Sequence, residues 1–225
     1  MQRLHARGGY TLLELMVVVA IIGFLSMMAL SALKGYARRE DTRRAALAVA
    51  GVLENARSQA MTTGRMTWVV FKEPVNGVAP WQDDSQFAAV IWDRDNDLQP
   101  TAADSVQPIW LPPGPKEHTS RYAPGVSPLG STPLPDLDQS LDIPNGNLAN
   151  AVDGTTFNVD ANLGVPAIGF NSQGFPVRVN KPLEPSSGPG AVYLTDNDSS
   201  VVSVVVLPIG AIRTLALDSA TEKWN

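Results

Sequence analysis

The densest group of side chains able to do chemistry is an acidic run, Asp93-Arg94-Asp95-Asn96-Asp97. Counted from Asp93 as position one, Asp95 and Asp97 take positions three and five, and Asp104 takes position twelve. Calcium binds six to eight oxygens, and EF-hand loops supply them from these positions. Leu98, however, stands where glycine normally makes the sharp turn, and Asp104 replaces the usual glutamate. Two interpretations stay open: a calcium site, or a solvated acidic turn after a strand.

Catalysis finds little support in the residue inventory. The chain has no cysteine and only two histidines, so the several His or Cys ligands of a zinc site are lacking. His118 lies in a proline-rich stretch, whereas a serine triad needs its histidine held rigidly against a carboxylate. We therefore expect a protein that is not an enzyme and requires no cofactor. A membrane-anchored hydrolase that uses His118 is the remote alternative.

The third chemical feature is one carboxylate at the edge of an apolar run. Glu14 is followed by nineteen uncharged, mostly apolar residues, Leu15 to Leu33. As a helix these residues rise roughly 28 Å, close to the hydrocarbon thickness of a bilayer. A carboxylate buried at such a position costs a few kcal/mol unless it is paired, and the run contains no basic residue. The pattern predicts a membrane-spanning helix whose glutamate needs a positive partner.

The residues around Glu14 resemble the prepilin signal of type IV pilins and type II secretion pseudopilins. The matching stretch is Gly9-Tyr10-Thr11-Leu12-Leu13-Glu14, followed by the apolar run. The resemblance implies that a membrane peptidase cuts between Gly9 and Tyr10 and methylates the new amine of Tyr10. Glu14 then becomes the fifth residue, where it serves filament assembly. The family usually has Phe first, and Tyr10 keeps the aromatic ring.

An α-amine at Tyr10 would supply the partner that Glu14 needs, within the chain or on a neighbour. The alternatives are a secretory signal peptide, a plain single-pass anchor and a buried core helix. Basic residues gather after the span, at Lys34, Arg38, Arg39, Arg43 and Arg44. A count of charges alone would place the C-terminal part in the cytoplasm. The resemblance implies the opposite orientation, which we follow.

The helix is expected to continue beyond the span. Residues 36–62 carry an apolar stripe at three- and four-residue steps, formed by Ala45, Val49, Val52, Leu53, Ala56 and Ala60. Gly64 suits the left-handed position that ends a helix. The sequence thus predicts one helix from Tyr10 to Thr62, with Gly23 and Gly35 as weak points. We expect the stripe to pack against the rest of the chain.

The remaining residues predict a β-rich head. Strands are expected at Thr67–Lys72, Phe87–Trp92, Thr155–Val159, Ile168–Phe170, Val177–Val179, Ala191–Thr195, Val201–Leu207 and Ile212–Leu217. Residues 112–150, with eight prolines, are expected to be a long irregular and partly mobile segment. The predicted fold is α+β and pilin-like: a long N-terminal helix packed on an antiparallel sheet. The predicted organisation is a cleaved leader (1–9), a transmembrane helix (10–35) and a head (36–225).

Two head segments add to the resemblance. Phe170–Val177, read as strand-turn-strand, and the closing Val204–Arg213 resemble the GspH/FimT branch of minor pilins and pseudopilins. That branch implies a filament subunit of low abundance with a periplasmic head, anchored in a bacterial inner membrane, whose partners are other pilins and the prepilin peptidase. A DNA-uptake receptor is the rival. From Met66 onward the chain has eight Lys or Arg against eighteen Asp or Glu, a balance of −10 that is poorly suited to nucleic acid.

Overall fold

The computed structural model describes residues 12–71, 86–100, 104–110, 121–122, 155–161, 164–195, 201–218 and 223–224. By its contacts the chain divides into two units, Met1–Ala37 and Arg38–Asn225. One helix, α1 (Leu12–Thr63), runs through the described parts of both. Its predicted bounds were Tyr10 to Thr62; the predicted C-terminal end is confirmed to within one residue, and the predicted start at Tyr10 lies outside the described residues. The two predicted weak points, Gly23 and Gly35, both lie within continuous helix.

The C-terminal end of α1 is the one predicted from glycine. Gly64 has a φ of 69°, in the left-handed region that costs a residue without Cβ little. Its amide donates to the carbonyl of Ala60 at 3.0 Å, which closes the last turn. Within the second unit the predicted stripe is also confirmed, since Ala45, Val49 and Leu53 are buried, as are Ala56 and Ala60.

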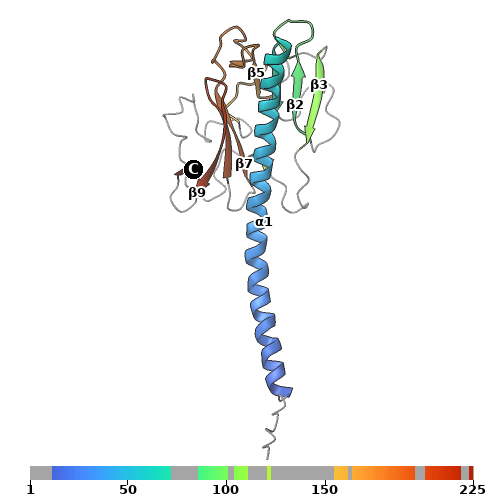
Figure 1. The fold of residues 1–225 in the computed structure, drawn as a ribbon, viewed down its shortest axis with the longest axis vertical. Coiled ribbons are helices and arrows are strands. Elements are labelled where there is room, and N and C mark those ends of the chain that lie inside the picture. Colours follow the sequence, from blue (N-terminus) through green and yellow to red (C-terminus); the bar gives the residue numbers. More distant parts are fainter. Residues whose placement is uncertain are drawn as a thin grey trace, which may run out of the picture. The chain divides into compact units, whose positions relative to one another are not determined.

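The strands of the second unit form two five-stranded antiparallel sheets. The first has the order β3-β2-β1-β5-β6, with bounds Ser105–Trp110, Gln86–Trp92, Thr67–Phe71, Ala167–Phe170 and Pro176–Arg178. The second has the order β10-β9-β8-β7-β4, with bounds Lys223–Trp224, Ile212–Asp218, Val201–Val206, Gly190–Thr195 and Arg121–Tyr122. Figure 1 shows strands of the two sheets on either side of α1. This is the predicted α+β, pilin-like architecture, with two sheets in place of one.

One core joins the helix to both sheets. The stripe packs with Val69 and Phe71 of β1, and with Val192 and Leu194 of β7. A second apolar cluster lies on the other face of the first sheet, around Trp68 and Val70. Successive residues of a strand point to opposite faces, so the apolar residues Trp68 to Phe71 of β1 contribute to both clusters. This explains why β1 is buried along its whole length.

Three short or edge strands were not predicted. β3 contains Pro108 opposite Ala89, and proline is tolerated there because β2 is the single neighbour of β3 among the described strands. β10 has two residues and no apolar pattern. β4 pairs with β7 and corrects the prediction of an irregular segment at residues 121–122. The rest of residues 112–150 lies outside the described part of the chain.

The predicted strand Thr155–Val159 is wrong. Thr155 makes one isolated bridge to Val192, and Val159 makes another to Pro166. The two bridges lead toward different sheets, so the segment links the sheets and extends neither. Phe157 anchors it in the core, with its ring stacked on Phe71 at 5.4 Å between centroids. The segment contains alternating β-forming residues, but its two described bridges go to two different neighbours, so no strand forms.

Candidate functional site

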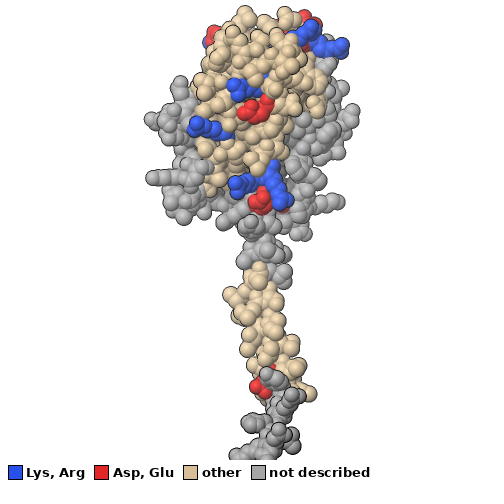
Figure 2. Space-filling view, in the orientation of Figure 1, with Lys and Arg blue, Asp and Glu red and all other residues tan. Residues whose placement is uncertain are grey.

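The apolar N-terminal segment is the first candidate site. Of the described residues, one stretch is long and apolar enough to cross a membrane, Leu12–Ala29, with a mean hydropathy of 2.5 and none of it buried. Glu14 lies in the first turn of α1. Figure 2 shows tan side chains over the described part of this segment, with acidic atoms near its end. Gly9 and Tyr10, the predicted processing residues, lie outside the described residues.

The exposed side chains of this segment are large and surround the helix. They include Leu13, Val17, Ile21, Phe24 and Met28, which follow one another at three- and four-residue steps, and also Met16, Val19, Ile22 and Leu25. A helix that is apolar all round belongs in a membrane or among other helices. The described residues of its own unit provide no such surroundings. The segment is therefore chemically suited to lipid first and to neighbouring apolar helices second.

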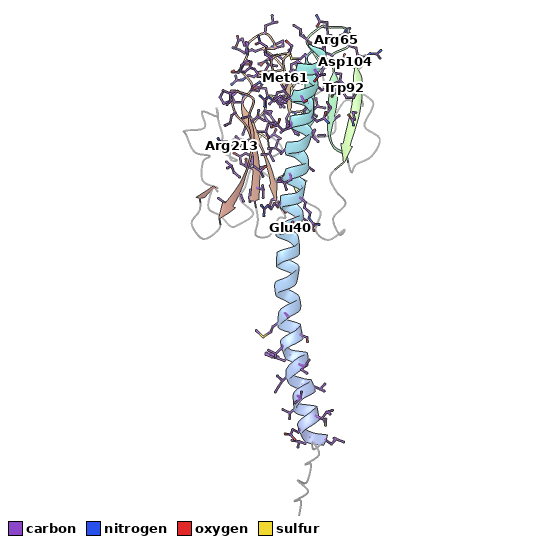
Figure 3. All side chains as sticks on the ribbon, in the orientation of Figure 1. Glu40, Met61, Arg65, Trp92, Asp104 and Arg213 are labelled. Atoms are coloured by element: carbon purple, nitrogen blue, oxygen red, sulfur yellow. The ribbon has the colours of Figure 1, made fainter. Side chains whose placement is uncertain are left out.

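The acidic loop between β2 and β3 is the second candidate site. The structure brings Asp93, Asp95 and Asp97 together, with one carboxylate oxygen from each lying within 4.8 Å of the others. Asp104 is not in this group, and its Oδ1 accepts a hydrogen bond from the Arg94 amide at 2.9 Å. Three of the four predicted ligands thus converge, and the fourth holds the loop backbone. Figure 3 shows Asp104 near the C-terminal end of α1.

Asp93 organises the turn from inside. Its side chain is fully buried, and its two oxygens accept hydrogen bonds from the amides of Asn96 at 2.6 Å and Leu98 at 3.0 Å. Burial raises the pKa of the Asp93 carboxyl, the two amide hydrogen bonds lower it, and the charges of Asp104 and Asp97 raise it. The net direction is upward. The loop holds a carboxylate whose ionised form is costly, and a cation would favour that form.

Leu98 takes the backbone conformation that glycine has in a calcium loop. Its φ is 64°, and Asn96 has a φ of 63°. A left-handed conformation costs a non-glycine residue roughly 1 kcal/mol. The Leu98 side chain packs against the second apolar cluster, which offsets this cost. The departure from the calcium pattern therefore does not prevent the turn.

The donor set fits calcium in part. Carboxylate oxygens bound to one calcium at 2.3–2.6 Å lie within about 5 Å of each other. The mutual distances of Asp93, Asp95 and Asp97 satisfy this limit. Asp95 and Asp97 each also use one oxygen on a backbone amide, at 3.3 and 2.8 Å. Each carboxylate oxygen has a second lone pair, so these hydrogen bonds and a metal ion are compatible.

A third feature, a contact between α1 and two turns, was not predicted from the sequence. Arg57 Nε donates to the carbonyl of Gly174 at 3.1 Å. Gly174 and Gly210 both have a φ of 80°, and a Cβ on Gly210 would overlap the Gly174 carbonyl oxygen. Asn171 Oδ1 closes the first turn by accepting from the amides of Gln173 and Phe175 at 3.0 and 2.9 Å. The two glycines indicate turns in the sequence. No sequence pattern predicts that the two turns contact each other.

The N-terminal segment is the part of the chain that comparison with known proteins identifies. Residues 4–30 match a family model described as the prokaryotic N-terminal methylation motif. No curated protein and no solved structure matches the chain. The match contains Gly9, Tyr10 and Glu14, and it covers the exposed apolar part of α1. By this match the chain carries the N-terminal signature of the type IV pilins and pseudopilins, on a pilin-like α+β fold.

Proposed function

We propose that the protein is a minor pilin or pseudopilin, a structural subunit that helps to initiate or cap a type IV pilus or a type II secretion pseudopilus. One observation carries the proposal: the methylation motif at residues 4–30 coincides with a helix whose apolar side chains are exposed all round. A pilin motif in general implies processing by a prepilin peptidase and assembly with other pilins. The role of a minor subunit goes beyond what the motif implies and is part of the proposal.

Processing would create the charge pair on which assembly depends. Cleavage after Gly9 leaves an α-amine at Tyr10, four residues before Glu14. Four residues of helix rise about 6 Å, so the amine and carboxylate can meet within one chain or between neighbours. Both charges are expensive to leave alone in a medium of low dielectric constant. The pair would therefore select the register in which one helix packs against the next.

The membrane and then the filament would cover the exposed helix. In this proposal the segment Leu12–Ala29 anchors the chain in the inner membrane as a single pass, with the head in the periplasm. On assembly, the helices of other pilins replace lipid around the same side chains. Lipid and helix surfaces are similarly apolar, so replacing lipid by neighbouring helices changes the free energy little. The charge pair between Tyr10 and Glu14 can then determine whether the helices associate.

Two head segments support the GspH/FimT branch. Phe170–Val177 and Val204–Arg213 carry the resemblance, and their turns meet where Gly174 and Gly210 approach each other. Arg57, from the helix, holds the first of these turns. A structural and not an enzymatic role follows from this proposal. His118 of the alternative hydrolase lies outside the described residues.

A DNA-uptake receptor is the second candidate on the same fold. It would need basic side chains gathered on the head, because phosphate binding depends on the release of counterions by Lys and Arg. The head is acidic from Met66 onward, with a balance of −10. We therefore propose a protein partner and no nucleic-acid partner.

We also propose that the acidic loop between β2 and β3 binds calcium, in addition to the structural role of the protein. The three carboxylates within 4.8 Å support it, and the raised pKa of Asp93 agrees with a site that lacks positive charge. The ion would order the link between β2 and β3. No cofactor is required for the proposed function itself.

Cleavage after Gly9 is the first test. Gly9→Val should leave the leader attached, because a branched side chain replaces the glycine at the cut. The intact mass of the processed wild type should correspond to a chain that begins at N-methylated Tyr10. Gly8→Ala, one residue earlier, is the matched control and should be processed normally. A mature terminus elsewhere, for instance after Ser31-Ala32, would contradict the proposal.

Assembly through Glu14 is the second test. Glu14→Ala should be cleaved normally but should co-purify with other pilins at a level about tenfold lower, since the charge pair is lost. Glu40→Ala, in the same helix, is the control and should assemble like the wild type. Equal assembly of both variants would mean that Glu14 does not select the register.

A further inference from the structure

A polar pocket lies in the second unit, between the connection of β6 to β7 and the turn that follows β8. Its volume is about 420 Å³. It is lined by Arg178, Lys181, Glu184, Ser186, Ser187, Pro189 and Pro208. Neither the methylation motif nor the acidic loop includes any of these residues. A volume of this size can hold a short polar ligand.

The cations of the pocket are not equivalent. Lys181 is paired with Glu184, whose two oxygens accept from Lys181 Nζ at 3.1 and 2.9 Å. Arg178 is half-buried, and its Nε is shielded from solvent with no acceptor among the described residues. Among the described residues, none supplies a hydrogen-bond acceptor or a carboxylate to its guanidinium. Because Nε is shielded, a ligand in the pocket would meet the outer nitrogens of the Arg178 guanidinium.

The frame around Arg178 is fixed by backbone hydrogen bonds. Three successive turns are closed by the amides of Lys181, Glu184 and Ser187, at 3.0 to 3.2 Å. Ser187 Oγ accepts from the Arg178 amide at 3.0 Å and donates to the Lys181 carbonyl at 3.4 Å. These contacts tie both ends of the connection together. The pocket is therefore formed before any ligand arrives, which lowers the entropy cost of binding.

The connection between β6 and β7 lies close to β6 and contains one strained residue. A Cβ on Gly188 would lie 2.5 to 2.8 Å from the backbone of Val177, so only glycine permits this approach. Ser186 has a φ of 60°, an uncommon conformation for a residue with a side chain. Strained backbone of this kind is found more often at binding sites.

Two exposed apolar residues are neighbours in the sequence of residues that line the pocket. Leu183 lies between the paired residues Lys181 and Glu184 and is 78% exposed. Ile209 follows Pro208 and is 66% exposed. A ligand with a carboxylate alone would leave both side chains in water. A ligand that carries apolar groups beside the carboxylate would cover them.

We propose that this pocket binds a carboxylate of an acidic and partly apolar peptide segment, with Arg178 as the group that receives it. A guanidinium matches a carboxylate with two parallel hydrogen bonds, which a single ammonium cannot do. The head has few cations, so an acidic segment finds in Arg178 a complementary charge amid a surface that otherwise repels it. The proposal goes beyond the filament role and holds whether or not the leader is processed.

Calorimetric titration of the full-length protein in a zwitterionic detergent tests the proposal. The probe is an acetylated and amidated tetrapeptide, leucine-glutamate-aspartate-leucine, compared with leucine-glutamine-asparagine-leucine. We expect the acidic peptide to bind and the neutral one to bind at least about tenfold more weakly, since hydrogen bonds to charged groups are the stronger ones. Binding should weaken as ionic strength rises. Equal binding of the two peptides would overturn the proposal.

Variants separate the contributions of the residues. Arg178→Gln should weaken binding of the acidic peptide at least about tenfold, whereas Arg43→Gln, an exposed arginine on α1, should leave it unchanged. Glu184→Gln should strengthen it, because the competing carboxylate disappears and Lys181 becomes available. This gain cannot arise from a failure to fold. If Glu184→Gln leaves the affinity unchanged or lowers it, the pocket does not recognise charge.

Two more titrations identify the source of the carboxylate. Leu183→Ala should weaken the peptide several-fold and leave tricarballylate, a small tricarboxylate, unaffected. Equal loss with both probes would overturn the part played by the apolar side chain. Inorganic phosphate should bind more weakly than the peptide. Phosphate binding as tight as that of the peptide would overturn the assignment to carboxylate.

Discussion

The helix α1 contains two apolar regions that behave in opposite ways. Leu12–Ala29 is apolar on every face, and each of its residues is exposed. The stripe from Ala45 to Ala60 is narrower, and Leu53, Ala56 and Ala60 within it have no exposed area at all. Polar side chains such as Glu54 and Ser58 occupy the other faces of this second region.

The difference shows that the distribution of apolar residues around a helix matters more than their number. Sheets on one side of a helix can cover an apolar stripe completely, so the apolar side chains of the second region are buried within their own unit. A helix that is apolar all round cannot be covered in this way. The first region needs a surrounding medium, and the methylation motif found there agrees with a membrane or filament environment.

The largest effect that we expect follows from removing the first region. A fragment of residues 38–225 should be soluble without detergent and should melt cooperatively, because the second unit holds its own core. The full-length protein should need detergent. Size-exclusion chromatography and circular dichroism measure both properties. Aggregation of the fragment would break the comparison, since the head would then depend on the first region.

The next largest effect contrasts two leucines of the second region. Leu53→Ala removes a side chain that is fully buried in the core, and should lower the free energy of unfolding by about 2 to 5 kcal/mol. Leu47→Ala removes one that is 56% exposed and should cost less than about 1 kcal/mol. Chemical denaturation of the two variants gives the difference. Similar losses would show that the stripe is not what joins the helix to the sheets.

Two glycines sharpen the comparison further, because the same substitution should have opposite signs. Gly210→Ala places a Cβ against the Gly174 carbonyl and the Arg57 side chain at a φ of 80°, and should cost about 2 kcal/mol or more. Gly51→Ala, in an exposed helix interior with open space around it, should stabilise by about 0.5 to 1 kcal/mol. Melting curves of the two variants measure both. A stabilising Gly210→Ala would mean that the contact between α1 and the turns does not constrain the head.

The smallest difference between paired measurements concerns calcium at the acidic loop. Calcium at ten times its Kd should add about 1.4 kcal/mol to the free energy of unfolding, by an equal amount in the full-length protein and in the fragment. Asp95→Ala should abolish this gain, and chelator should reverse it. Magnesium should do less, because it demands a tighter octahedral geometry. Unmoved melting curves with both ions would make the loop an acidic turn and nothing more.

Local patterns predicted most of the elements. The bounds of α1, its stripe and its end at Gly64 follow from periodicity and one left-handed glycine, which are properties of neighbouring residues. β1, β2 and β8 were predicted to within one residue because continuous apolar runs leave little choice of state. β3 was not predicted because proline, here Pro108, disrupts a strand unless the strand lies at the edge of a sheet. Whether a strand lies at an edge depends on the whole sheet and cannot be read from neighbouring residues.

By itself the sequence determined the long helix, the exposed apolar segment with Glu14 and the β-rich head, since each depends on spacing within a few residues. Only the tertiary structure decided which strands form which sheet, because pairing depends on partners far apart in the chain. It also placed Asp93 inside its turn and Asp104 on the Arg94 amide. The Arg57 contact with Gly174 spans 117 residues. The position of Arg178, whose Nε has no acceptor among the described residues, depends on a frame closed by Ser187. Contacts of this range arise from packing of the whole head, for which no local pattern is a signal.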